Sequence, residues 1–419
     1  MKEFFLKTLL AGAAAISIGL AAEAQITQSS TQLAQPISPS FFGDDSILHL
    51  AGYFDTGYAI PEGDADEAFS LKFAPIVHYQ YRNWLLFEAE GEFDFEDNGS
   101  SEKNSALEYA MLHVLVNDNL AIGVGKYMSP VGQFVQNLHP SWINKLPSMP
   151  IGFASGHHGS GAAPNNDFGI QARGGFQTSE KGRLNYAAFV GNGPELVIEE
   201  AEDGDLNIEG FTLPAKIDDA NSNKSTGLRL GFLPIPNFEI GFSFKRADAA
   251  FASVIQAHEG EEHEDEEGEE HGDEEGDEHG DEESGHDDEE DNHSGSLVRD
   301  RNYRVWGVDF YYAPQRVRNL VFRGEFVSTE LGAGQSDEYD RDLKRWEAWY
   351  AQASYFMADK KLEAVTRYGN FQPNGEEKGK QWAVGLNYLL RGNSVIKTAY
   401  EFNDSEEPDR LLFQYAYGF

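Results

Sequence analysis

The chain of 419 residues contains no cysteine, so no disulfide bond can stabilise it. Basic residues are also scarce, because 32 Lys and Arg stand against 71 Asp and Glu, for a formal net charge of −39. A chain with this charge repels phosphates, which argues against nucleic acid as a partner. Without disulfides, an exported chain of this length must rely on burial or on closed backbone hydrogen bonding, and a β-barrel supplies the latter.

Long apolar runs are missing as well, apart from one near the N-terminus. Residues 8–22 are apolar and follow a charged start, and Ala22 and Ala24 form a small-x-small pair. This pattern is typical of a signal peptide, so we expect residues 1–24 to be removed. The run is shorter than the roughly 20 apolar residues that a spanning helix needs. Residues 25–46 are polar and aperiodic, which predicts a loose periplasmic segment.

The chain does contain many short segments in which apolar and polar residues alternate. Trp382, Val384 and Leu386, for example, alternate with Gln381 and Asn387. A period of two indicates a β-strand with one apolar face. The predicted strands span 47–58, 69–82, 84–95, 106–116, 119–127, 166–177, 183–192, 224–234, 237–247, 302–313, 318–330, 345–358, 361–371, 380–391, 394–403 and 409–419. Because the second face is polar in strand after strand, the pattern favours lipid outside and water inside.

The links between these segments give an independent indication. They are short after even-numbered segments and mostly long after odd-numbered ones, an asymmetry typical of outer-membrane barrels. We therefore predict an all-β fold, a transmembrane antiparallel β-barrel of about 16 strands over residues 47–419. Short periplasmic turns and long extracellular loops would join the strands in the bacterial outer membrane. The last strand ends on Phe419 and resembles the signal that such proteins present to the barrel-assembly machinery, so we expect that machinery and outer-membrane lipid as partners.

The third long loop, residues 128–165, contains more apolar and aromatic residues than an exposed loop should. Loops of this length and composition are usually packed against another part of the protein. The interior of a large barrel offers such a place, and the outer rim is the alternative. We favour the interior, where the loop would constrict the pore.

Several motifs resemble the phosphate-selective porin family. The runs Gly125 to Gly132 and His139 to Asn144 look like the third-loop region of that family, and Leu362 to Tyr368, Val384 to Tyr388 and the terminal Phe419 resemble its C-terminal part. The resemblance covers roughly the mature chain outside the fifth long loop. It implies a 16-stranded porin, commonly a homotrimer, that allows passive diffusion of small polar solutes or ions.

Alternation also predicts which charged side chains face the lumen. The predicted pore-lining residues are Lys72, Arg82, Glu88, Glu90, Glu92, Asp94, Arg173, Arg229, Arg323 and Arg367. The third strand supplies four acids in a row, and most of the arginines lie on later strands. We therefore expect a mixed lumen with opposed acidic and basic walls, and we do not carry the phosphate preference over to this chain.

The fifth long loop, residues 248–301, has the most biased composition. From residue 258 to residue 293 there are 22 acidic residues and no Lys or Arg, so we expect a disordered segment. Six histidines recur in it: His258, His263, His271, His279, His286 and His293. Imidazoles among carboxylates suit weak binding of Zn²⁺ or another divalent cation, and a solvated acidic brush is the alternative interpretation. No cofactor is otherwise required.

The sequence thus predicts a porin for small polar solutes or ions, with a loop that gathers divalent metal. The alternative is a closed structural or adhesive barrel that displays an acidic loop. We do not expect an enzyme, because a barrel hydrolase needs a Ser or Asp nucleophile beside a positioned histidine. His49, His78 and His113 instead occur singly in predicted strands, which favours plain lumen residues.

Overall fold

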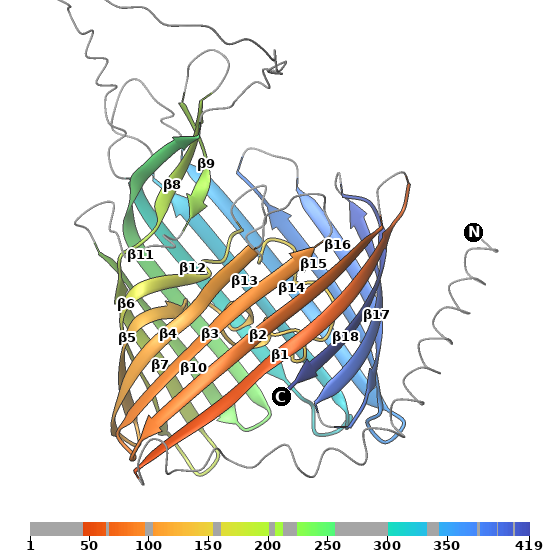
Figure 1. Cartoon of the computed structure of the whole chain (residues 1–419), viewed down its shortest axis with the longest axis horizontal. Coiled ribbons are helices and arrows are strands. Elements are labelled where there is room, and N and C mark those ends of the chain that lie inside the picture. The colour runs from red at the N-terminus through yellow and green to blue at the C-terminus, as the bar shows by residue number, and fades with distance from the viewer. Residues whose placement is uncertain are drawn as a thin grey trace, which may run out of the picture.

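The computed structural model shows a β-barrel of tilted strands (Figure 1). It describes residues 45–63, 67–96, 104–153, 161–200, 206–212, 224–255, 301–332, 343–374, 378–391, 393–404 and 407–419. The strands are β1 (Ser46–Pro61), β2 (Ala68–Tyr81), β3 (Leu85–Glu96), β4 (Asn104–Asn117), β5 (Leu120–Met128), β6 (Asn166–Gln177), β7 (Arg183–Gly191), β8 (Glu195–Glu200), β9 (Leu206–Thr212), β10 (Ser225–Ile235), β11 (Phe238–Ile255), β12 (Arg301–Tyr312), β13 (Leu320–Leu331), β14 (Lys344–Met357), β15 (Leu362–Gln372), β16 (Gly379–Leu389), β17 (Ser394–Asp404) and β18 (Arg410–Gly418). A single π-helical turn, η2 (Phe134–Leu138), lies between β5 and β6.

Sixteen of these strands form the closed barrel, and β8 and β9 are the two outside it. Each barrel strand pairs antiparallel with the next, with β7 followed directly by β10, and β18 returns to pair with β1 over Tyr53 to Pro61. Closure leaves no open sheet edge, so every strand finds hydrogen-bond partners on both sides. The short turns gather at the lower end in Figure 1, and β8 and β9 stand at the opposite end.

The barrel is apolar outside and polar inside, which is the reverse of a soluble protein. On β16, Trp382 and Val384 are each 47% exposed, whereas the alternate residues Gln381 and Asn387 are buried. Leu386 continues the exposed apolar face. Exposed large apolar side chains that alternate with buried polar ones fit a wall between lipid and an interior filled with polar groups. We conclude that the barrel spans a membrane of the bacterial outer-membrane type.

No helix in the described residues is long and apolar enough to cross a membrane.

The prediction of a 16-stranded antiparallel barrel is confirmed, and each predicted segment overlaps one barrel strand. Two differences occur at the ends of loops. The link 193–223 was predicted without strands but contains the hairpin of β8 and β9. Residues 248–255 of the predicted disordered loop 248–301 belong instead to β11, which continues to Ile255 and pairs there in parallel with β8. Pairing partners supplied by a distant loop could not be read from the local pattern.

The predicted signal peptide, residues 1–24, lies outside the described residues, and so do the six histidines from 258 to 293.

Candidate functional site: the lumen and its third loop

The third loop, residues 129–165, is described over 129–153 and 161–165 and is held by side chains of the barrel wall. Its first anchor is Glu325 on β13, whose carboxylate accepts the backbone N–H groups of Gln133 and Phe134 at 3.0 and 2.9 Å. Gly132 precedes them with φ +74°, and a side chain at this position would overlap the Glu325 carboxylate. Glycine therefore permits the close approach of the loop backbone to the wall.

A second set of anchors holds the later part of the loop. Arg367 on β15 donates to the carbonyl oxygens of Ser148 and Met149, both at 2.9 Å. Asn387 on β16 donates to the carbonyl oxygen of Lys145 at 2.8 Å. Side chains that bind backbone carbonyls fix the course of a loop with no secondary structure of its own. The anchors come from strands far from β5, so the loop crosses the barrel interior.

Apolar packing fixes the loop between its polar anchors. Phe134 and Phe153 meet Tyr350 of β14 edge to face, with ring centroids 5.8 and 5.3 Å apart. Leu146 is fully buried in a separate cluster. Its buried partners there are Val365, Ala383 and Ala399 of β15, β16 and β17. The loop therefore covers the inner face of β11–β17, and that covered wall resembles the core of a soluble domain.

The opposite part of the wall carries carboxylates. On β3, Glu88, Glu90, Glu92 and Asp94 alternate along one face, as the sequence predicts. Lys72 of the neighbouring β2 lies 2.5 Å from the Glu92 carboxylate and 3.4 Å from that of Asp94. One lysine thus serves two carboxylates in this part of the wall.

The remaining two carboxylates of β3 face histidines. Glu88 binds Arg173 at 2.8 Å and lies 2.9 Å from Nε2 of His113. Glu90 is only 2% exposed and lies 3.9 Å from Nε2 of His139 in the third loop. The loop histidine therefore lies close to the acidic part of the wall.

The predicted basic wall is only partly an open surface, because two of its arginines, Arg229 and Arg367, are buried. Arg229 binds Asp309 at 2.8 Å, and Arg367 lies 3.6 Å from Glu401 besides binding the loop. Arg323 on β13 is half-buried on the same face as Glu325, two residues away. The acids that pair with Arg229 and Arg367 lie two strands away around the barrel, and they largely neutralise the charge of these two arginines.

Arg82 was also placed wrongly. It lies in the short turn between β2 and β3 with φ 52°, and its guanidinium binds Asp45 at 2.7 Å. The alternation continued one residue too far in the prediction, because a turn residue has no fixed face. Arg82 belongs to the rim of the barrel and not to the pore wall.

Three ionisable residues that organise the lumen were not singled out from the sequence. Asp309 follows the alternation of β12 and Asp167 that of β6, so closer use of the same pattern would have found both. Asp167 binds Lys245 at 2.9 Å, and both side chains are fully buried. His139 gave no such signal, because its position depends on the course of the loop.

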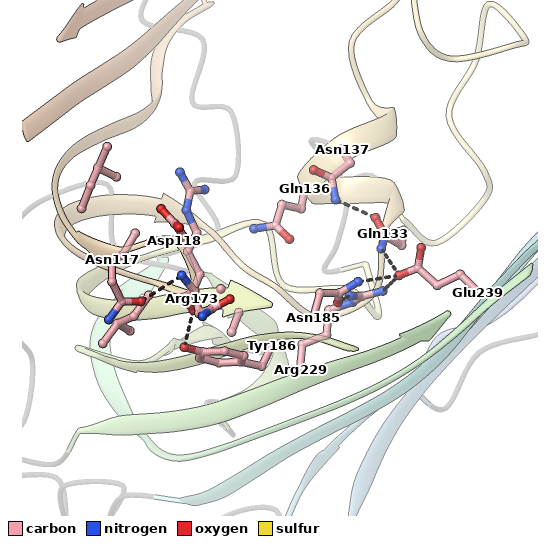
Figure 2. A pocket seen from close by; sticks show the side chains of 16 residues that line it. Asn117, Asp118, Gln133, Gln136, Asn137, Arg173, Asn185, Tyr186, Arg229 and Glu239 are labelled. Carbon is pink, nitrogen blue, oxygen red and sulfur yellow. Dashed lines mark hydrogen bonds and ion pairs between the residues drawn. The ribbon is translucent and has the colours of Figure 1, made fainter. Parts of the chain in front are cut away.

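The space beside the loop is hollow at both ends of the barrel. A cavity of about 520 Å³ opens near the short-turn end, between the π-helical turn and β4–β7. Figure 2 shows Gln133 and Asn137 of the loop above Arg229 and Glu239, with Arg173 to the left, near Asp118 and Tyr186. The lining of this first cavity is polar, with amide groups and charges of both signs.

A second cavity of about 530 Å³ lies toward the other end of the barrel. Asp55, Lys72 and Asp94 line it from the wall, and His139 and Ser141 line it from the loop. A smaller hollow of about 190 Å³ runs along Glu88, His113 and Arg173 and shares Gln136 and Asn137 with the first cavity. Water-sized polar space thus follows the acidic side of the loop, whereas the other side is packed.

The closed barrel has 16 strands and a polar lumen that its own third loop partly fills. These features together define a structural class of membrane protein. The fold is that of the outer-membrane porins.

Solved structures of such proteins share this fold. OmpF of Salmonella typhi in complex with daunomycin aligns with a TM-score of 0.53 at 12% identity, over 92% of this chain and all of that one. An anion-selective porin from Comamonas acidovorans gives 0.52 at 10% identity, over 89% of this chain and all of that one. The trimer form of OmpT, an outer membrane protein of Vibrio cholerae, gives 0.52 at 12% identity, over 90% and 100%. No protein-family model and no curated protein sequence matches the chain.

Proposed function

We propose that the protein is an outer-membrane porin for passive diffusion of small polar solutes and ions, with a preference for cations. The polar cavities on either side of the third loop, together with the porin fold, support diffusion. No group in the described residues resembles a nucleophile with a positioned histidine, so we propose no catalytic role.

One observation carries the cation preference, and it is the unequal pairing of charges in the lumen. Five carboxylates lie on the inner face of β1 and β3, and Lys72 and Arg173 form ion pairs with three of them. The carboxylates are Asp55, Glu88, Glu90, Glu92 and Asp94. Elsewhere Arg229 is matched by an acid, and Arg367 by an acid and by loop carbonyls. A lumen with excess negative charge on its open side attracts cations and repels anions, so the phosphate preference of the resembling family does not suit this pore.

The test is planar-bilayer recording of the purified protein in a salt gradient. Discrete conductance steps with a reversal potential of the sign for cation preference would support the proposal. An anion-preferring reversal potential would contradict the charge argument but leave the pore standing. Absence of steps would favour the alternative, a closed structural or adhesive barrel.

Substitutions on β1–β3, where the barrel wall borders the cavities (the open wall), sharpen this test. Asp55→Asn combined with Asp94→Asn removes two carboxylates that line the larger cavity. The ratio of cation to anion permeability should fall roughly twofold or more, because focused charge in a narrow polar space sets selectivity. Glu363→Gln is the matched control, because this carboxylate lines neither of the two larger cavities and faces Lys145 of the loop at 3.3 Å. An equal change in the control would show that selectivity does not depend on the open wall.

We further propose that the acidic loop with histidines 258–293 gathers divalent cations such as Zn²⁺ outside the pore. The composition of this loop supports the proposal, because imidazoles are good ligands for zinc. A loop that acted only as an acidic brush would need no histidine. Replacing the six histidines by asparagine keeps the acidic charge and should reduce zinc retention by the purified protein. Unchanged retention would favour the acidic brush.

We also propose a homotrimer in outer-membrane lipid, assembled through recognition of the C-terminal strand that ends on Phe419. The trimer form of the Vibrio cholerae protein with this fold supports the oligomeric state. The exposed aromatic and aliphatic side chains of the outer face support contact with lipid. Light scattering of the detergent-purified protein measures the mass of the assembly, and a monomer would contradict the proposal.

A further inference from the structure

Two histidines that appear single in the sequence lie together in the barrel. His49 on β1 and His78 on β2 are directly opposite in the antiparallel register. Their rings stack with centroids 5.9 Å apart and an interplanar angle of 24°. His49 is exposed and His78 partly exposed, so both rings are accessible to a small solute.

The strand register places this pair on the lumen face. His78 is directly opposite Glu88 of β3, and directly opposite residues of paired strands share a face. Glu88 lines one of the lumen cavities together with His113. On β1, Tyr53 lies four residues from His49 on the same face and donates to Glu92 inside the barrel. The pair is three positions from the short-turn end of β1, where Ser46 pairs with Tyr81.

We propose that His49 and His78 form a weak binding site for a divalent transition-metal cation, of the class of Zn²⁺, near the short-turn mouth of the lumen. An ion bound to one nitrogen of each ring at about 2.1 Å would hold the ring centres roughly 5–6 Å apart. The observed 5.9 Å lies within that range, and rotation of the stacked rings about their side-chain torsions would turn one nitrogen of each toward a shared ion. Imidazole is neutral and able to ligate near pH 7, and it prefers zinc, copper and nickel over magnesium.

Two protein ligands make a weak site, and this suits a channel. Among the described residues, no group of three or more His, Asp or Glu side chains is arranged to hold a metal ion. Glu88, the nearest carboxylate in register, is engaged by Arg173 and His113. Water would therefore complete the coordination, and the ion would leave again easily, as passage through a pore requires.

The site also lies on the acidic side of the lumen. From the long-loop end toward the short turns, the wall presents the row of Asp55, Lys72 and Asp94, and lower down the row of His49, His78 and Glu88. Carboxylates that attract any cation are thus followed by imidazoles that select transition metals. A role in transport rests on the proposed porin function, but binding to the pair does not.

Residue-resolved chemical modification tests the site in the full-length protein. Diethyl pyrocarbonate modifies accessible imidazoles, and peptide mass spectrometry reports each histidine separately. With Zn²⁺ at about ten times its dissociation constant, modification of His49 and His78 should slow roughly tenfold. Mg²⁺ should protect neither ring, because it prefers oxygen ligands. Buried His113 serves as an internal reference that zinc should not change.

The variant His49→Asn distinguishes a paired site from independent rings. Zinc should no longer protect His78 in this variant, because a single imidazole with water ligands binds too weakly. Ile47→Ala, one row closer to the turn, is the matched control and should retain protection. Absence of protection in the wild type, equal protection by Mg²⁺, or undiminished protection of His78 in His49→Asn would each overturn the proposal. The bilayer recordings test the porin function separately from this binding site. If the barrel showed no conductance but zinc still protected both rings, only the porin function would be refuted.

Discussion

The two sides of the lumen are built from strands of the same pattern but have different environments. On β1–β4, carboxylates and histidines face cavities, and few basic groups balance them. On β11–β17, the third loop covers the wall, and Phe134, Phe153 and Leu146 pack there as in a soluble core. The difference shows that alternation decides which residues point inward, whereas the course of one loop decides which of them meet water.

The comparison also explains why charge has different consequences on the two sides. A charge in a covered wall cannot be solvated and must be paired, because an unpaired buried charge costs several kcal/mol. Lys245, Arg229 and Arg367 each have an acidic partner, which lies two or three strands away around the barrel. In the open wall, by contrast, the side chains of Lys72 and Asp94 are 23% and 28% exposed and keep contact with water. On the proposed porin function, we therefore expect the open wall to set the selectivity.

The largest effect is expected from breaking a pair in the covered wall. Lys245 and Asp167 are 2.9 Å apart and fully buried, so Lys245→Met leaves a buried carboxylate without its cation. The free energy of unfolding should fall by about 3–5 kcal/mol, because a lone buried charge is strongly destabilising. Denaturant unfolding of the refolded protein in detergent micelles measures this change.

Two further variants control that experiment. Lys245→Met combined with Asp167→Asn removes both charges but keeps an acceptor for the backbone N–H groups of Asn192 and Gly193, so it should recover most of the stability. Lys72→Met affects a lysine of the open wall whose side chain is 23% exposed, and it should cost less than Lys245→Met. A loss for Lys72→Met as large as that for Lys245→Met would contradict the distinction between the two walls.

An intermediate effect is expected from releasing the third loop. Glu325→Ala removes the acceptor of the backbone N–H groups of Gln133 and Phe134. A hydrogen bond of this kind contributes roughly 0.5–1.5 kcal/mol, and the loop loses two of them, so the loop should detach more often from the wall. Single-channel recordings should show larger and noisier open currents. Glu239→Ala is the matched control, because its contact with the loop is longer, at 3.4 Å to Gln133. Quiet, unchanged currents in Glu325→Ala would show that this anchor does not hold the constriction.

Most of the fold could be predicted from the sequence, because strand alternation and turn spacing are local properties. The segment 166–177 matches β6 at both ends, and the even count of strands follows from the loop asymmetry. The hairpin of β8 and β9 was missed because its partner, the end of β11, lies far along the chain.

The candidate site was less predictable, for physical reasons that particular residues illustrate. Glu88, Glu90, Glu92 and Asp94 lie on the predicted face, since alternation alone decides it. Which arginines would be neutralised depends on cross-strand register, and the pairing of Arg229 with Asp309 requires that β10 and β12 flank β11 at a defined height. The approach of His139 to Glu90 depends on loop anchors from distant strands. These contacts form only when the strands have closed into the barrel and the third loop has packed inside it.

The smallest effect is expected at Arg82, which alternation wrongly placed in the pore. Its guanidinium pairs with Asp45 at the exposed rim, where water screens the interaction. Arg82→Ala should therefore leave both the reversal potential and the unitary conductance of the channel unchanged. The double variant Asp55→Asn with Asp94→Asn, measured in the same bilayers, gives the scale of a real change in the lumen. If Arg82→Ala shifted the reversal potential as much as that double variant does, the rim would contribute to selectivity, and the open wall of β1–β3 would not be its sole source. A difference between the two variants would instead confine the selecting charges to side chains that alternate inward on the strands.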